Sequence, residues 1–124
     1  MSDLTIPGSQ STPSIHASWN DGVLAMQGDS YPENSFEMFG QVISWVEQFL
    51  TETDRPLRLE LELLYLNTSS IKAMMDIFDL LEDAHGRSRD VVTRWYYDED
   101  NERVAELAEE FKEDCTFPFE IVGR

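Results

Sequence analysis

The stretch at residues 57–81, LRLELELLYLNTSSIKAMMDIFDLL, changes its hydrophobic period near its middle. In the first part apolar residues occupy every second position, as in a strand with one buried face; these residues are Leu57, Leu59, Leu61 and Leu63. In the second part they recur every three or four positions, as along one face of a helix; these are Ile71, Met74, Met75, Phe78 and Leu81. The stretch therefore predicts a half-buried strand that leads directly into a helix.

Four small polar residues, Asn67-Thr68-Ser69-Ser70, lie where the predicted strand meets the predicted helix. Each of them can serve as the N-cap, because a short side-chain oxygen there accepts a hydrogen bond from a backbone N–H group that has no partner within the helix. A phosphate would also be tolerated here, because the free N–H groups and the positive end of the helix dipole favour an anion. Residue types leave two readings open: a helix cap with no further role, which is the commoner case, or a functional site centred on Thr68.

The composition predicts one folded, acidic domain over residues 1–124, with residues 1–12 only loosely held. The chain has 124 residues, of which 41% are apolar, and this is enough for a buried core. A net charge of −16 would repel phosphate backbones and anionic lipid surfaces. We therefore expect no nucleic-acid partner and no membrane insertion. A protein with a basic patch is a better partner, and plain solubility is the other explanation of the charge.

Cysteine usage and the N-terminal sequence predict a cytoplasmic protein. The chain has a single cysteine, Cys115, so no internal disulfide can form and a reducing compartment fits. The first ten residues have neither the basic region nor the apolar run of a signal peptide. No stretch of the sequence approaches the length of a transmembrane helix.

The pattern along the whole chain predicts an α/β fold in the order ββαβαβαβ. Strands are expected over residues 14–19, 22–27, 57–66, 90–97 and 117–122, the last at a sheet edge because it contains Pro118. Helices are expected to begin within residues 32–35, 67–70 and 98–101. The buried stripe expected for the first helix is Phe36, Phe39, Ile43, Val46 and Leu50, with Trp45 and Phe49 flanking it. The alternation of strands and helices argues for a mostly parallel sheet, and the polar face of the central strand argues for helices on one side only.

The sequence shows no catalytic set. His16, His85 and Cys115 are scattered, and no nucleophile motif surrounds the cysteine. The acidic run at residues 98–100 lacks the spacing and the glycine of a calcium-binding loop, so it is interpreted as a charged helix start. We therefore expect a protein that is not an enzyme, with no cofactor and no bound metal. A small metal-dependent hydrolase built on this acidic run is the less favoured alternative.

Three motifs, in this order along the chain, resemble those of a known family. They are Gly28-Asp29-Ser30-Tyr31-Pro32-Glu33-Asn34, then Tyr65-Leu66-Asn67-Thr68-Ser69-Ser70-Ile71-Lys72, and Trp95-Tyr96-Tyr97-Asp98-Glu99-Asp100-Asn101-Glu102. They are similar to the motifs of the SiaC family, which are small bacterial regulatory phosphoproteins. The likeness covers nearly the whole chain.

The resemblance implies a fold and a function. The fold is expected to be similar to that of STAS domains, the anti-sigma-factor antagonists. The threonine of the Asn-Thr-Ser-Ser motif, here Thr68, would be phosphorylated by a SiaB-like protein kinase and dephosphorylated by a SiaA-like phosphatase of the PP2C type. The unphosphorylated form would bind a SiaD-like diguanylate cyclase and promote cyclic-di-GMP synthesis, which controls biofilm formation and aggregation. A STAS-type antagonist that captures an anti-sigma kinase is the alternative within the binding class.

The partner-binding face is expected to surround Thr68. On this hypothesis it includes Asn67, Ser69, Ser70 and Lys72 from the predicted helix start. The loop residues Tyr31, Pro32, Glu33 and Asn34 are added on the assumption that this loop lies beside Thr68.

Overall fold

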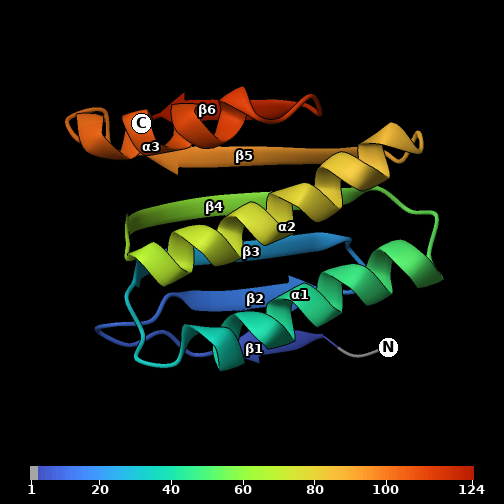
Figure 1. Cartoon of the computed structure of the whole chain (residues 1–124), viewed down its shortest axis with the longest axis horizontal. Coiled ribbons are helices and arrows are strands. Elements are labelled where there is room, and N and C mark those ends of the chain that lie inside the picture. Colours follow the sequence, from blue (N-terminus) through green and yellow to red (C-terminus); the bar gives the residue numbers. More distant parts are fainter. Residues whose placement is uncertain (1–2) are drawn as a thin grey trace.

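Residues 3–124 are described by a computed structural model, in which they form one six-stranded sheet and three helices. The strands are β1 (Leu4–Ile6), β2 (Ser14–Ser18), β3 (Val23–Ser30), β4 (Leu57–Leu66), β5 (Val91–Tyr97) and β6 (Phe119–Gly123). The helices are α1 (Ser35–Glu52), α2 (Thr68–Gly86) and α3 (Glu102–Glu113). The strands lie side by side in chain order, from β1 at one edge to β6 at the other (Figure 1).

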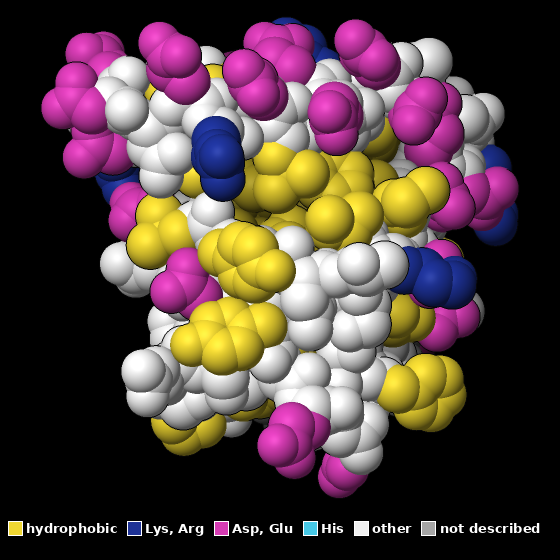
Figure 2. All heavy atoms as spheres, turned by 60° about the vertical axis from the view of Figure 1, so that its left-hand side comes forward, with side chains coloured by type: hydrophobic (Ala, Val, Ile, Leu, Met, Phe, Trp, Pro, Cys, Tyr) yellow, Lys and Arg dark blue, Asp and Glu magenta, His cyan; other side chains and the backbone are white. Residues whose placement is uncertain are grey.

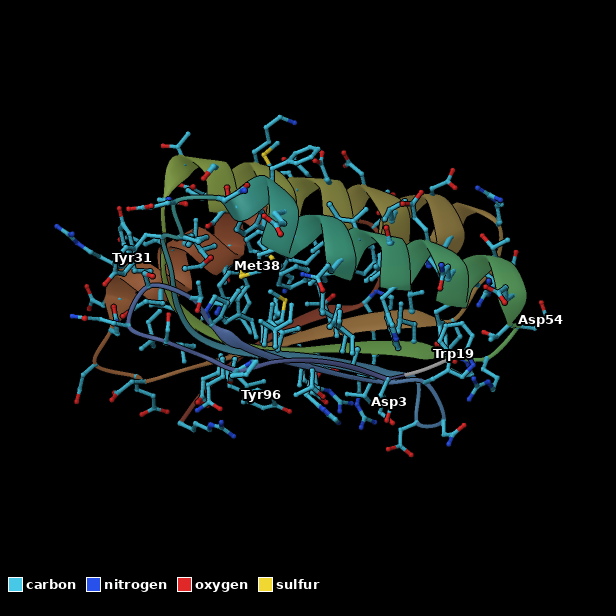
Figure 3. All side chains as sticks on the ribbon, turned by 90° about the horizontal axis from the view of Figure 1, so that it is seen from below. Asp3, Trp19, Tyr31, Met38, Asp54 and Tyr96 are labelled. Carbon is cyan, nitrogen blue, oxygen red and sulfur yellow. The ribbon has the colours of Figure 1, made fainter. Side chains whose placement is uncertain are left out.

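The sheet has an antiparallel part and a parallel part. The pairs β1–β2 and β2–β3 are antiparallel, whereas β3–β4, β4–β5 and β5–β6 are parallel. One helix joins each parallel pair. Because such crossovers are right-handed and all three advance across the sheet in the same direction, the helices must lie on the same face. Figure 3 shows all of them on one side of the sheet. The predicted fold class, α/β with a mostly parallel sheet and helices on one face, is confirmed.

The predicted element order missed the first strand. The expectation that residues 1–12 are loosely held is wrong for Leu4–Ile6, which pairs with β2 in the register Leu4↔Ala17 and Ile6↔Ile15; residues 1 and 2 lie outside the described part of the chain. The polar segment that follows is also held, since the hydroxyls of Ser9 and Thr12 lie 2.7 Å apart in a hydrogen bond. A strand of three residues is too short to show a period, so the sequence pattern could not reveal it.

The core lies between the sheet and the helices. Leu57, Leu59, Leu61 and Leu63 of β4 are each only 1% exposed, as their alternation predicted. Met38 of α1 projects between the helices and the sheet in Figure 3, whereas Tyr96 projects from the opposite face. That opposite face carries ion pairs between strands, such as Arg94 with Glu120 at 3.2 Å. The prediction that helices cover one face of the sheet and that the other face is exposed to solvent is therefore confirmed. The edge position of β6 is also confirmed.

The buried stripes of α1 and α2 were predicted in part, since Phe39 and Val46 of α1 and Met74, Phe78 and Leu81 of α2 are buried as expected. Phe36 is 89% exposed and Met75 is 49% exposed, although both were placed in buried stripes. In α1 the buried apolar residues are Met38, Phe39, Val42, Trp45, Val46 and Phe49. Trp45 and Phe49 turn inward because they pack against Trp19, with ring centroids 5.8 and 5.3 Å from it. Where two adjacent faces of a helix both carry apolar residues, the helical period alone cannot choose between them.

Candidate functional site at the carboxyl edge of the parallel strands

The loops that follow β3 and β4 come together at one edge of the sheet. In parallel strands the carboxyl ends share an edge, and in open α/β sheets that edge is where ligands usually bind. The backbone N–H of Asn67 donates to the carbonyl oxygen of Ser30 at 2.9 Å, so the two loops are directly joined. The candidate site is therefore built on α2 where it begins and on the segment that leads into α1 (left-hand side of Figure 1).

Asn67 is the N-cap of α2, which decides a choice that residue types had left open. Its Oδ1 accepts the backbone N–H of Ser70 at 2.9 Å and also the hydroxyl of Ser69 at 3.2 Å. Its carbonyl oxygen accepts the N–H of Ile71 at 2.9 Å. Thr68 is thus the first residue of the helix and has no capping role.

The three hydroxyls that follow the cap differ in access and in hydrogen bonding. Ser70 is fully buried, and its Oγ lies 2.8 Å from the Oγ of Ser30, which is also fully buried. Ser69 is exposed but donates its hydroxyl to Asn67. Thr68 is exposed, and its hydroxyl has no hydrogen-bond partner within residues 3–124. Among these hydroxyls, that of Thr68 is the one most accessible to a modifying enzyme.

The first turns of the three helices differ in charge. The first turn of α2 contains no acidic residue, whereas α1 has Glu37 and α3 has Glu102 in the corresponding turn. Lys72 lies one helical turn after Thr68, with its side chain 78% exposed and 3.8 Å from Asp76. Residues four positions apart on a helix are neighbours on its surface, so Lys72 is placed to attract an anion at Thr68.

The loop at residues 31–34 does lie beside the start of α2. The rings of Tyr31 and Tyr65 meet edge to face with centroids 6.0 Å apart, and both side chains are exposed, by 40% and 55%. Figure 3 places Tyr31 at one end of the molecule, away from Trp19 and Asp54. Glu33 and Asn34 are also exposed, and Oδ1 of Asn34 caps α1 by accepting the N–H of Glu37 at 3.1 Å.

The predicted site residues are thus close together, but they are not equally available to a partner. Pro32 and Ser70 are buried, so they support the site from beneath. The other predicted residues reach the surface fully or in part: Tyr31, Glu33, Asn34, Asn67, Thr68, Ser69 and Lys72.

An apolar groove between α1 and α2 was missed by the sequence analysis. It has a volume of about 260 Å³ and extends from the start of α2 along two helical turns. Its lining is Ser35, Phe36, Phe39, Gly40, Ile43, Ser69, Lys72, Ala73 and Asp76.

On the face that contains the carboxyl edge, hydrophobic side chains gather across the middle and acidic side chains line the upper rim (Figure 2). A signal for exposed apolar residues did exist at 64–65, where Leu64 and Tyr65 break the alternation of β4 and are 47% and 55% exposed.

The residues considered as catalytic or metal-binding candidates, Cys115, His16 and the acidic run at 98–100, lie outside this site. Burial raises the pKa of the Cys115 thiol to about 11, so it is protonated at neutral pH and is a poor nucleophile. His16 lies on β2, and its Nδ1 is 3.3 Å from the hydroxyl of Thr5 on the neighbouring strand. Oδ1 of Asp98 accepts the N–H of Asp100 in the turn before α3, whose N-cap is Asn101. Residues 3–124 contain no group of three or more His, Cys, Asp or Glu side chains arranged to hold a metal ion.

The fold and the site together define a small α/β domain. It presents the Thr68 hydroxyl and apolar side chains at one edge, as expected of a regulatory domain that other proteins bind. The family model for SiaC family regulatory phosphoproteins matches residues 6–124. The chain therefore belongs to the SiaC family. None of the helices in the described part of the chain is long and apolar enough to cross a membrane.

The relatives and solved structures agree with this assignment. The chain is 71% identical over 121 residues to an uncharacterised protein of Pseudomonas aeruginosa, covering 98% of this chain and 96% of that protein. It is similar to the crystal structure of apo-SiaC from the same species, with a TM-score of 0.95 and 69% identity over 98% of this chain and 99% of that one. It is also similar to a chain in the crystal structure of the diguanylate cyclase SiaD in complex with its activator SiaC. The TM-score is 0.97, and the identity is 69% over 98% of this chain and 100% of that chain.

Proposed function

We propose that this protein is a non-enzymatic regulatory phosphoprotein that activates a diguanylate cyclase in its unphosphorylated form and is switched off by phosphorylation of Thr68. The activation is supported by the likeness to SiaC, which was solved in complex with SiaD as its activator. The identity to that chain is 69% over 98% of this chain. The switch is supported by the family, which is one of regulatory phosphoproteins.

The observation that carries the choice of Thr68 is the different state of the three hydroxyls. A kinase must reach the oxygen that it modifies, and the Ser70 hydroxyl is buried against Ser30. The Ser69 hydroxyl is engaged by the cap. Thr68 is exposed at the first position of α2, where a phosphate lies near free backbone N–H groups and the positive end of the helix dipole. The modified protein should therefore keep its fold.

Phosphorylation changes what a partner meets at this edge. It adds about −1.5 to −2 charges and three strong acceptor oxygens. A partner surface that covers the Thr68 hydroxyl with apolar or acidic groups would have to bury that charge or lie against it, and both are unfavourable. The unmodified threonine imposes neither cost. The phosphate charge would therefore weaken binding of the cyclase even if the fold of this protein stays the same.

The switch needs two further enzymes. A dedicated protein kinase would add the phosphate and a phosphatase of the PP2C type would remove it, so the balance of the two would set cyclic-di-GMP synthesis and, through it, biofilm formation and aggregation. The kinase would use ATP and the cyclase GTP, which are nucleotides of the cytoplasm, where we place the protein.

The experiment compares Thr68→Asp and Thr68→Ala with the wild type in a cyclase activation assay. The charged variant should bind and activate the cyclase much less than the wild type, because the carboxylate imitates part of the phosphate charge. The alanine variant should activate as the wild type does and should not respond to the kinase. Full activation by Thr68→Asp would contradict exclusion by charge.

A further inference from the structure

Lys72 lies on α2 between two positions that can carry a negative charge. Thr68, the first residue of the helix, is four residues before it, and Asp76 is four residues after it. Residues four apart on a helix have their Cβ atoms about 5–6 Å apart. A phosphate on Thr68 and the carboxylate of Asp76 would therefore lie on opposite sides of the same ammonium group.

The ion pair that Lys72 makes in the unmodified protein is a weak one. Its Nζ lies 3.8 Å from Oδ2 of Asp76, and the two side chains are 78% and 50% exposed. Solvent screens such a pair, so it contributes little to stability. The order of the charges is also the less favourable one, because a base that precedes an acid on a helix opposes the helix dipole. Lys72 is therefore easily drawn away from Asp76.

A phosphate on Thr68 would be the stronger partner for Lys72. It carries about −1.5 to −2 charges and three acceptor oxygens, whereas a carboxylate carries one charge. The acid would then precede the base, which is the favourable order on a helix. Across the apolar groove, the described residues of α1 line it without any charged side chain that could compete. In the loop before α1 the titratable side chains are those of Tyr31 and Glu33, and neither is positive.

We infer that phosphorylation of Thr68 transfers Lys72 from Asp76 to the phosphate, so that Lys72 is the phosphate-binding side chain of the modified protein. The inference rests on the proposed function and adds to it a relay of charge along α2. Lys72 and Asp76 are the charged residues that line the apolar groove, and their charges balance in the unmodified protein. After the transfer the phosphate holds Lys72 and Asp76 has lost this partner. The acidic surface then extends over about 12 Å, the rise of the eight residues from Thr68 to Asp76.

The test is a phosphorus NMR titration of the full chain with phosphothreonine at position 68, incorporated during translation so that no kinase is needed. An ammonium group beside the phosphate favours its dianion and lowers the pH midpoint of the titration, which is otherwise near about 6. Lys72→Gln should raise this midpoint by about 0.3, the size expected of an exposed ion pair. Lys72→Arg should change it by less than about 0.1, because arginine keeps the charge. The rise caused by Lys72→Gln should at least halve in about 1 M sodium chloride, where the Debye length is about 3 Å.

Two further variants separate the transfer from a general effect of charge. Lys112→Gln, in the last turn of α3, is the matched charge control and should change the midpoint by less than about 0.1. Asp76→Asn removes the competing carboxylate. It should lower the midpoint by about 0.1–0.2 when Lys72 is present, and by less than about 0.1 in the Lys72→Gln background.

The outcomes separate this inference from the proposed function. Equal midpoints for the unsubstituted chain and Lys72→Gln would overturn the inference and leave Thr68 as the modified residue. A rise of the same size for Lys112→Gln would overturn it as well, since the effect would then be one of net charge. If Asp76→Asn acted equally in both backgrounds, Lys72 would not be shared between the two anions and the transfer would be wrong. Failure of the kinase to modify Thr68 would refute the proposed function alone, because the titration uses phosphothreonine that no kinase has added.

Discussion

The two ends of the sheet use similar residues in opposite ways. At the end where the parallel strands begin, the aromatic rings are packed: Phe49 is fully buried, and its ring stacks on Trp45 with a centroid distance of 5.5 Å. At the end where those strands finish, Phe36, Tyr31 and Tyr65 reach the solvent. Figure 3 shows the labelled Trp19 and Tyr31 at these opposite ends.

Polar groups differ between the two ends in the same way. At the amino edge, Arg89 donates to the carbonyl oxygens of Leu50 and Arg55, which ties the loop after α2 to the last turn of α1 and to the loop that follows it. Gly22 lies so close there that a Cβ atom on it would be 2.4 Å from the carbonyl oxygen of Pro56. At the carboxyl edge the Thr68 hydroxyl has no partner within the described residues. The amino edge is built for stability, and the carboxyl edge leaves apolar and polar groups available to a partner.

Two phenylalanines of α1 give the largest expected contrast. Phe49→Ala should lower the free energy of unfolding by about 3–5 kcal/mol, because it empties a fully buried site. Phe36→Ala should change it by less than about 0.5 kcal/mol, because the side chain is 89% exposed. Urea denaturation followed by circular dichroism measures both. If both variants lost a similar free energy of unfolding, Phe36 at the start of α1 would be packed as Phe49 is near its end, and the contrast would be wrong.

Adjacent residues at the start of α2 should differ by less. Asn67→Ala removes the N-cap and should lower the free energy of unfolding by about 1 kcal/mol. Thr68→Ala should be within about 0.5 kcal/mol of the wild type, since Thr68 caps nothing and alanine favours a helix. Thermal unfolding of the two variants measures the difference. A larger loss for Thr68→Ala than for Asn67→Ala would show that the threonine has a structural role.

The smallest expected effect is a pH dependence at the end of the molecule away from the site. Thr116 donates its hydroxyl and its backbone N–H to the carboxylate of Glu82, at 2.6 and 2.7 Å, and these bonds lower the pKa of Glu82. A lowered pKa in the folded state gives stability above the unfolded pKa of about 4.3, and this stability is lost as the pH falls through the folded pKa.

Glu82→Gln should therefore cost at most about 1 kcal/mol at pH 7, since solvent screens the interaction, and less at pH 3. Denaturant unfolding at the two pH values measures this. Glu109→Gln, at an exposed position of α3, is the control and should resemble the wild type at both. An equal loss for Glu82→Gln at pH 3 and pH 7 would exclude the ionised carboxylate as the cause.

The sequence predicted those parts of the fold in which one face is buried and the other is not. The alternation of β4 and the change of period after Leu66 placed the strand, the helix and Thr68 correctly. The prediction failed for Phe36 and Met75, because the helical period shows which residues share a face but not which face meets the sheet. It also could not choose the cap among the four residues at 67–70, since all of them have oxygen atoms that can accept the bond. The exposed Phe36 is the failure of most interest, since departures from the local pattern are expected at functional surfaces.

The most direct measurement is the intact mass of the protein after incubation with ATP and its kinase, beside a Thr68→Ala control. We predict a gain of one phosphate by the wild type and none by the variant, with the phosphate removed by the PP2C-type phosphatase. No phosphate on the wild type, or one that persists on Thr68→Ala, would contradict the account. Thr68 would then be only the first residue of α2, and the carboxyl edge would need another explanation for its exposed side chains.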